Sequence, residues 1–177
     1  MSTSTPDPVR IRFLDLPAAA MTALLAGDRA AAGVLVGAEL DAYFLTEDAR
    51  WLWGYRLDQL ADRPQDAPWL VKVAVAEPGG AVVGYAGFHG APDEAGTVEV
   101  GYSVLPGFRR LGYARAMLAA LLRRAAAEPS VATVRATIGP ENAGSLATIR
   151  DFGFTEVGEQ WDERDGLEII FEVPAGR

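Results

Sequence analysis

The chain has no cysteine and a single histidine, and both shortages narrow the chemistry it can perform. Without cysteine there is no disulfide, no iron–sulfur cluster, no Cys-ligated zinc and no thiol nucleophile. The one histidine, His89, argues against a His-based catalytic triad and against a metal site built from several histidines. We therefore expect neither a bound metal nor a covalent cysteine intermediate.

Long apolar runs and an excess of positive charge are also missing. No stretch reaches the ~18 apolar residues that a membrane-spanning helix needs. Residues 1–9 are small and polar, without the charged-then-apolar pattern of a secretory leader. The 16 Lys and Arg residues against 24 Asp and Glu give a net charge of −8, whereas nucleic-acid-binding proteins usually carry a basic surface. These features predict a cytoplasmic protein that binds neither membranes nor nucleic acid.

The composition is that of an ordinary globular protein, with 50% apolar and 23% charged residues over 177 positions. We expect one α+β domain over residues 1–177. Hydrophobic periodicity and turn residues predict strands at 9–13, 69–76, 81–88, 97–105, 131–138, 155–161 and 167–173. The same criteria predict helices at 17–25, 46–63, 112–127 and 141–152, with shorter helical pieces within 30–45.

Acidic residues are unevenly distributed along the chain. Residues 100–127 contain no Asp or Glu, although 24 of the 177 residues are acidic. The same window holds five arginines, which are Arg109, Arg110, Arg115, Arg123 and Arg124. A basic segment in an acidic protein indicates that an anion binds there.

The junction between the strand and the helix of this segment is the expected anion site. Gly112 and Ala114 open the predicted helix and carry little or no side chain, so an anion can approach the backbone closely. The first turn of a helix has free N–H groups and the positive end of the helix dipole, which together bind phosphate. The alternative is a solvated loop followed by a helix with surface arginines.

Two motifs then resemble a known family. The segment VEVGYSVLPGFRRLGYA at residues 98–114 resembles the fourth strand and pyrophosphate loop of the GNAT N-acetyltransferases. The loop signature of that family is Arg/Gln-x-x-Gly-x-Gly/Ala, which Arg109, Gly112 and Ala114 match. The sequences PENAGS at 140–145 and DFGF at 151–154 resemble its second motif.

The resemblance is clearest over residues 82–173. The phrase Gly-Tyr-x-Val-x-Pro and the spacing Asn-x-x-Ser are similar to the RimJ/RimL branch, whose members acetylate protein N-termini. The resemblance implies the GNAT fold, an α+β architecture with a mixed, mostly antiparallel central sheet of six to seven strands flanked by helices. In that fold the strands at 97–105 and 131–138 splay apart.

By the same resemblance, unpaired backbone groups of the first splayed strand bind the pantetheine arm of acetyl-CoA as an added strand would. The amides of the loop that follows bind the pyrophosphate, and Asn142 hydrogen-bonds the pantetheine or the leaving end. The cofactor-binding residues implied in this way are Tyr102, Ser103, Val104, Leu105, Arg109, Arg110, Leu111, Gly112, Tyr113, Ala114, Arg115 and Asn142.

Amine attack on a thioester needs a neutral amine, a polarised carbonyl and a proton for the departing thiolate. The backbone N–H of Val104 or Leu105 can polarise the carbonyl. The resemblance implies that Glu99 removes the amine proton, directly or through water; the alternative is a structural or substrate-orienting carboxylate. Ser145 stands where the RimJ/RimL branch has a serine near the sulfur, and it either donates a proton or hydrogen bond or is an ordinary helix residue.

Other GNAT branches carry a tyrosine acid seven residues after the asparagine, and Ile149 occupies that position here. The tyrosine-acid mechanism is therefore not expected, and water or Ser145 would protonate the thiolate. Three residues are candidates for the acceptor side of the site: His89, Asp93 and Trp53. Their plainer interpretations are a loop histidine, a solvated loop acid and a core tryptophan.

The function that these residues predict is acetyl transfer from acetyl-CoA to a primary amine by direct attack in a ternary complex. The acidic composition favours a cationic acceptor, such as a protein N-terminus, a polyamine or an aminoglycoside. The alternative is a non-catalytic acyl-CoA-binding regulatory or interaction module on the same fold. Dimers are common in the family, so a homodimer is the expected further partner.

Overall fold

A computed structural model of the protein describes residues 9–176. The expectation that no secretory leader occupies the start of the chain falls on residues 1–8, which lie outside this range. The described chain forms a seven-stranded sheet in the order β1-β2-β3-β4-β5-β7-β6. The strands are β1 Arg10–Asp15, β2 Lys72–Glu77, β3 Val82–Phe88, β4 Thr97–Val104, β5 Thr133–Ile138, β6 Thr155–Asp162 and β7 Gly166–Pro174.

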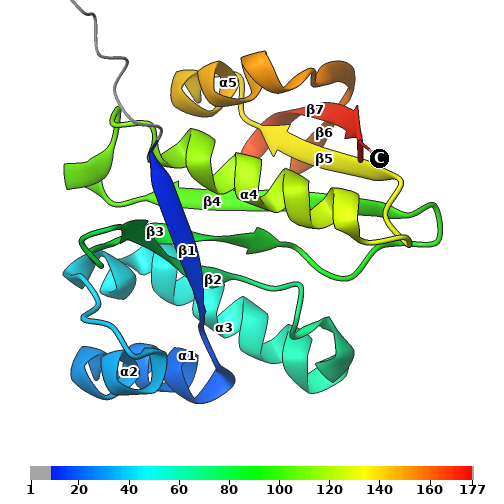
Figure 1. The fold of residues 1–177 in the computed structure, drawn as a ribbon. Helices are drawn as coiled ribbons and strands as arrows, with labels where there is room; N and C mark the ends of the chain where they lie inside the picture. The colour runs from blue at the N-terminus through cyan, green and yellow to red at the C-terminus, as the bar shows by residue number, and fades with distance from the viewer. Residues whose placement is uncertain (1–8, 177) are drawn as a thin grey trace, which may run out of the picture.

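Helices cover both faces of the sheet (Figure 1). The α-helices are α1 Ala18–Leu25, α2 Arg29–Val36, α3 Glu47–Asp62, α4 Tyr113–Ala127 and α5 Ala143–Ile149. Short 3₁₀ turns lie at Ala42–Leu45, Pro64–Asp66, Pro106–Phe108 and Arg150–Phe152. Helices α1–α3 pack on one face, while α4 and α5 pack on the other, so the sheet has a hydrophobic core on each side.

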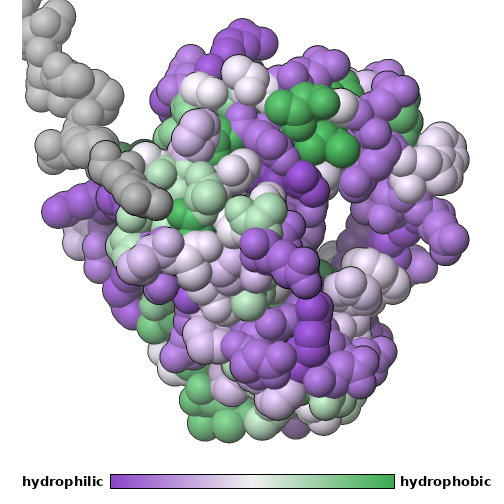
Figure 2. Space-filling view, turned by 90° about the vertical axis from the view of Figure 1, so that its right-hand side faces the viewer, coloured by the Kyte–Doolittle hydropathy of each residue, from purple (hydrophilic) through white to green (hydrophobic). Residues whose placement is uncertain are grey.

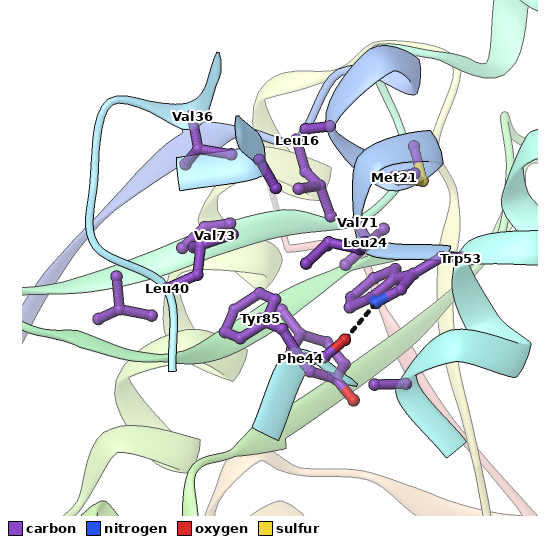
Figure 3. Packing of buried hydrophobic residues seen from close by; sticks show 14 of the residues in the cluster. Leu16, Met21, Leu24, Val36, Leu40, Phe44, Trp53, Val71, Val73 and Tyr85 are labelled. Carbon is purple, nitrogen blue, oxygen red and sulfur yellow. Dashed lines mark hydrogen bonds between the residues drawn. The ribbon is translucent and has the colours of Figure 1, made fainter. Parts of the chain in front are cut away.

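Alternation along the strands divides the side chains between these two cores. In β2, Val73 and Val75 join the core beneath α1–α3, and Ala74 joins the core beneath α4 and α5. The first core is built around aromatic rings. The indole Nε1 of Trp53 donates a hydrogen bond to the carbonyl of Phe44 at 2.8 Å, and both rings pack against Tyr85 (Figure 3).

Helix α3 is capped by Thr46, the first residue of the helix predicted at 46–63. The hydroxyl of Thr46 accepts a hydrogen bond from the N–H of Ala49 and donates one to the carbonyl of Tyr43 at 2.9 Å. Glu47 and Asp48 follow in the first turn, where negative charge interacts favourably with the helix dipole. This cap fixes the start of the helix that packs Trp53 into the core.

Replacing Thr46 by alanine is expected to lower the free energy of unfolding by about 1 kcal/mol, because an N–H in the first turn of α3 loses its side-chain acceptor. Urea denaturation followed by circular dichroism measures the loss. Thr46→Ser keeps the hydroxyl and should recover most of the stability. Equal stability of all three proteins would show that Thr46 does not act as a cap.

Strands β4 and β5 run parallel but pair only at their beginnings. Three residue pairs join them, and the last is Glu99 with Arg135. Beyond it, β4 stays paired with β3 as far as Val104, while β5 stays paired with β7 as far as Ile138. The two strands therefore form a fork, and the expected fold class is confirmed, with seven strands in the sheet.

Candidate active site

The fork leaves part of the β4 edge open. The N–H of Leu105 donates to the carbonyl of Val83 at 2.9 Å, and Ser103 lies opposite Tyr85. Since backbone groups in a strand alternate in direction, those of Tyr102 and Val104 point away from β3, into the fork. Of the two expected donors to a substrate carbonyl, Leu105 is thus already occupied, whereas the N–H of Val104 is open.

The same alternation corrects two of the expected cofactor contacts. Ser103 and Leu105 direct their backbone groups toward β3, so neither offers them to a ligand in the fork. The hydroxyl of Ser103 lies 2.9 Å from that of Tyr43 instead, and the side chain of Leu105 is buried. The strand edge that a ligand can reach is provided by Tyr102 and Val104.

The loop before α4 presents a group of free amides. Arg110 and Gly112 have φ angles of 62° and 91°, which turn the chain sharply into the helix. The first helical bond runs from the N–H of Ala116 to the carbonyl of Gly112 at 3.0 Å. Within residues 9–176, the N–H groups of residues 110–115 have no hydrogen-bond acceptor. This arrangement suits a bound phosphate.

The arginines of the acid-free window do not all contribute to this loop. Arg115 pairs with Asp151 at 2.6 Å, and Arg124 donates to the carbonyl of Pro68 at 2.5 Å and lies over the ring of Trp69. Arg109 donates from Nε to the carbonyl of Val104 at 3.1 Å, and Arg110 is exposed in the loop. Positive charge at the loop therefore comes from Arg109, Arg110 and the helix dipole.

Helix α5 is capped by Asn142 and brings Ser145 near Tyr102 of β4. The Oδ1 of Asn142 accepts from the N–H of Ser145 at 3.0 Å, so this oxygen caps the helix and only the side-chain amide nitrogen remains to serve a ligand. The hydroxyl of Tyr102 is buried near Ser145 and Thr148 and has no well-formed hydrogen bond within residues 9–176. Burial raises the pKa of this phenol. An unpartnered hydroxyl beside the fork fits a polar ligand there.

Glu99 lies at the base of the fork. Its Oε1 accepts from the hydroxyl of Thr137 at 2.5 Å and lies 3.3 Å from Nδ1 of His89. Burial alone would raise the pKa of Glu99, but hydrogen bonds from His89 and Thr137, the charge of His89 while its ring is protonated, and the charge of Arg135 bring the pKa below its ordinary value. The carboxylate is therefore ionised at neutral pH.

His89 and Asp93 border the same region as Glu99. A cavity of about 180 Å³ is lined by these three side chains together with Arg63, Gly90, Ala91, Thr97 and Arg135. His89 also borders a second cavity of about 130 Å³, beside Gly101 and Tyr102. Oδ1 of Asp93 accepts from the N–H groups of Ala95 and Thr97, which fixes the loop.

The side of the molecule on which this loop projects is hollowed. Figure 2 looks onto that side and shows an opening in the surface with a largely hydrophilic rim. Arg164, in the turn between β6 and β7, forms an ion pair with Asp48 and lies over the ring of Trp51, 4.2 Å from its centroid. The β6–β7 hairpin and α3 are thus joined by these two contacts.

Trp53 does not belong to this region, which corrects one expected acceptor residue. Its side chain is fully buried in the core beneath α1–α3. Trp51 and Tyr55, two residues to either side, are 47% and 53% exposed, because a step of two residues along a helix changes the face. Tyr43, Arg56 and Gln59 contact Ser103 or His89 from segments that carry no motif, so the sequence alone did not predict their place at the site.

Between residues 9 and 176, no helix is both long enough and apolar enough to span a membrane. Over the same range, no three His, Cys, Asp or Glu side chains form a group that could hold a metal ion.

Comparison with known proteins decides the family. Residues 15–155 match the acetyltransferase (GNAT) domain. The chain belongs to the GNAT acetyltransferase family. A curated relative, the uncharacterized N-acetyltransferase YjdG of Bacillus subtilis (strain 168), is 34% identical over 73 residues, which are 41% of this chain and 44% of that protein. The match thus spans less than half the length of the relative.

Solved structures share the GNAT fold. A spermidine N-acetyltransferase SpeG chimera from Vibrio cholerae and hSSAT has a TM-score of 0.65 at 12% identity, covering 94% of this chain and 96% of its own. RimJ from Mycobacterium smegmatis, in complex with CoA-disulfide, has a TM-score of 0.62 at 19% identity, covering 95% and 86%. At these identities the similarity establishes the fold.

Proposed function

We propose that the protein transfers an acetyl group from acetyl-CoA to a primary amine. The observation that supports this most is the joint presence of an open β4 edge and, at the next helix, six free backbone N–H groups. An extended amide-containing chain can pair with a strand edge, and a pyrophosphate can bind at a helix N-terminus. Coenzyme A has both parts in one molecule, and the RimJ structure contains a CoA derivative.

The residues present fit this donor. Tyr102 and Val104 would hydrogen-bond the pantetheine amides, and the side-chain amide of Asn142 would add a donor from α5. The pyrophosphate would be held by backbone amides of the loop and by the side chains of Arg109 and Arg110. The residues assigned to the pyrophosphate are Arg109, Arg110, Leu111, Gly112, Tyr113, Ala114 and, through its backbone only, Arg115.

Bound acetyl-CoA would supply an activated acyl carbon. The N–H of Val104, which points into the fork, would stabilise negative charge on the carbonyl oxygen. The amine proton would pass to a group at the base of the fork, where Glu99 is an ionised carboxylate. Ser145 or water would donate a proton to the thiolate, since Ile149 has no acidic group.

The acceptor would be a cation, because the protein has a net charge of −8. A protein N-terminus, a polyamine and an aminoglycoside all meet this condition, and the likeness to the RimJ/RimL branch favours the first. His89 and Asp93 would border the acceptor. We further propose a cytoplasmic location and a homodimer.

A second candidate is a non-catalytic acyl-CoA-binding module. The observation that favours it is the engagement of Glu99, whose Oε1 already accepts from Thr137 and contacts His89. A carboxylate held in this way could serve only to join β4 to β5.

A thiol-release assay distinguishes the two candidates. Wild-type protein with acetyl-CoA is mixed in turn with an N-terminal peptide, spermidine and an aminoglycoside, and free CoA thiol is followed with a colorimetric reagent. We expect thiol release that depends on at least one of the amines. The acetylated product should be heavier than that amine by about 42 Da, because an acetyl group replaces one hydrogen. Binding of acetyl-CoA without amine-dependent release across the set would support the non-catalytic module.

A further inference from the structure

Three polar side chains are buried beneath the loop that carries His89. Arg56, Gln59 and Asp66 are 5%, 9% and 2% exposed, and among residues 9–176 only Thr148 is a further buried polar residue. Burying charged groups is unfavourable unless they are paired and hydrogen-bonded. The burial of these three side chains therefore indicates a role other than filling space.

Two of the three side chains, Arg56 and Gln59, bind the same backbone atom, and Asp66 holds one of them. The carbonyl of His89 accepts from Nη1 of Arg56 at 3.1 Å and from Nε2 of Gln59 at 2.8 Å. Arg56 also donates to Oε1 of Gln59 at 2.7 Å, and Gln59 donates to Oδ2 of Asp66 at 2.8 Å. On its other side, the N–H of His89 donates to the carbonyl of Glu99 at 2.8 Å. The backbone of this loop residue is thus fixed from α3 and from β4.

The imidazole is fixed as well. Its Nδ1 lies 3.3 Å from Oε1 of Glu99, which Thr137 in turn holds. The ring lies over Gly101, where a Cβ would come within 2.8 Å of Nε2. With Nδ1 directed at the carboxylate, Nε2 is left as the proton-accepting nitrogen of a neutral imidazole. Nε2 thus lies beside Gly101, and the N–H of the next residue, Tyr102, points into the fork.

We propose that Nε2 of His89 accepts the proton of the attacking amine, that Glu99 orients the imidazole, and that Arg56, Gln59 and Asp66 are positioning residues. This inference rests on the proposed acetyl transfer. As the amine nitrogen bonds to the acyl carbon, its N–H bond breaks and the proton passes to Nε2. The C–S bond then breaks, its electron pair leaves on sulfur, and His89 returns its proton to solvent.

Several charged groups face His89. Glu99 and Asp93 favour the protonated ring, while Arg63 and Arg135, on the rim of the same cavity, and Arg56, beneath the loop, oppose it. Of these, Glu99 is in direct contact with the ring. Removing its charge should therefore change the pH dependence of the reaction.

The test is the pH profile of kcat/KM for wild type, His89→Gln and Glu99→Gln, with Glu159→Gln on the exposed edge strand β6 as the matched control. An imidazole base gives wild type an acid limb, because the protonated ring can no longer accept the proton of the amine. His89→Gln should lose 10²- to 10⁴-fold, about the range of general-base catalysis, together with this limb. Glu99→Gln should keep the limb but shift it to lower pH, because the imidazolium loses its carboxylate. Glu159→Gln should match wild type.

Gln59→Leu tests the positioning network in the same assay. Loss of the hydrogen bond to the His89 carbonyl should lower kcat more than it changes KM, with the acetyl-CoA affinity and the acid limb retained. The proposal is overturned if His89→Gln stays within threefold of wild type and keeps the limb, or if Glu99→Gln alone abolishes turnover. If wild type transfers acetyl groups and His89→Gln transfers them equally well, only this inference is contradicted. No thiol release by wild type with any amine contradicts the proposed function.

Discussion

Replacing Gly112 by glutamate is expected to weaken acetyl-CoA binding at least 100-fold, a loss of about 2.7 kcal/mol. Gly112 has a φ of 91° in the loop of free amides, and an added Cβ would come within 3.3 Å of Cγ2 of Val9. A carboxylate at this point would stand where we propose the pyrophosphate to bind, and like charges in contact repel by several kcal/mol. Isothermal titration calorimetry gives the dissociation constants.

Two further variants separate charge from backbone strain. Gly112→Ala introduces the strain of a side chain at positive φ without charge, and it should weaken binding much less than glutamate does. Gly158→Glu adds the same charge on β6, where a Cβ would meet nothing within 4 Å, and it should bind as wild type does. Equal affinity of Gly112→Glu and wild type would show that the loop does not hold the pyrophosphate.

Replacing Gly84 by alanine should lower the free energy of unfolding by about 3 kcal/mol, because the site is overpacked. A Cβ on Gly84 would lie 2.0 Å from the backbone oxygen of Ser103 and 2.9 Å from Cε of Met117. The first of these atoms belongs to β4, which pairs with β3 at this point, so relief requires the strands to separate. Urea denaturation monitored by tryptophan fluorescence measures the change.

Gly158→Ala is the matched control for Gly84→Ala. Both glycines lie in strands, but Gly158 has open space around its Cα, so the alanine there should change stability little. The Gly84 variant should also bind acetyl-CoA more weakly, because β3 holds the open edge of β4 in place. Similar stability of the two variants would contradict the close approach of β3 and β4.

Much of the fold can be predicted from the sequence because its signals are local. The start of α3 after Thr46 and the end of α4 before Pro129 depend on neighbouring residues, and both lie close to the predicted bounds. The predicted strand at 69–76 is regular only from Lys72. Trp69 belongs to a turn instead, in which its N–H donates a hydrogen bond to the carbonyl of Asp66. Strand bounds depend on a partner far away in the sequence, and a single sequence does not reveal that partner.

The site is predictable to a smaller degree. The glycine-rich helix start and Glu99 lie in recognisable motifs, and the structure places both beside the fork. Whether the N–H of Val104 is open to a ligand depends on the register between β4 and β3, and the residue types of the two strands do not reveal this register. The contact between His89 and Glu99 likewise follows from strand pairing. Arg56 and Gln59 reach His89 across more than 29 residues, and their local sequence predicts only a helix.

The central claim is that coenzyme A binds along the open edge of β4 and at the start of α4. Backbone amide shifts of ¹⁵N-labelled protein, recorded by NMR during a titration with CoA, test this most directly. We expect the largest shift changes at Tyr102, Val104 and residues 110–115, and much smaller changes in α1, α2 and β6. Changes that are largest outside the fork and the loop, or no changes at millimolar CoA, would contradict the account.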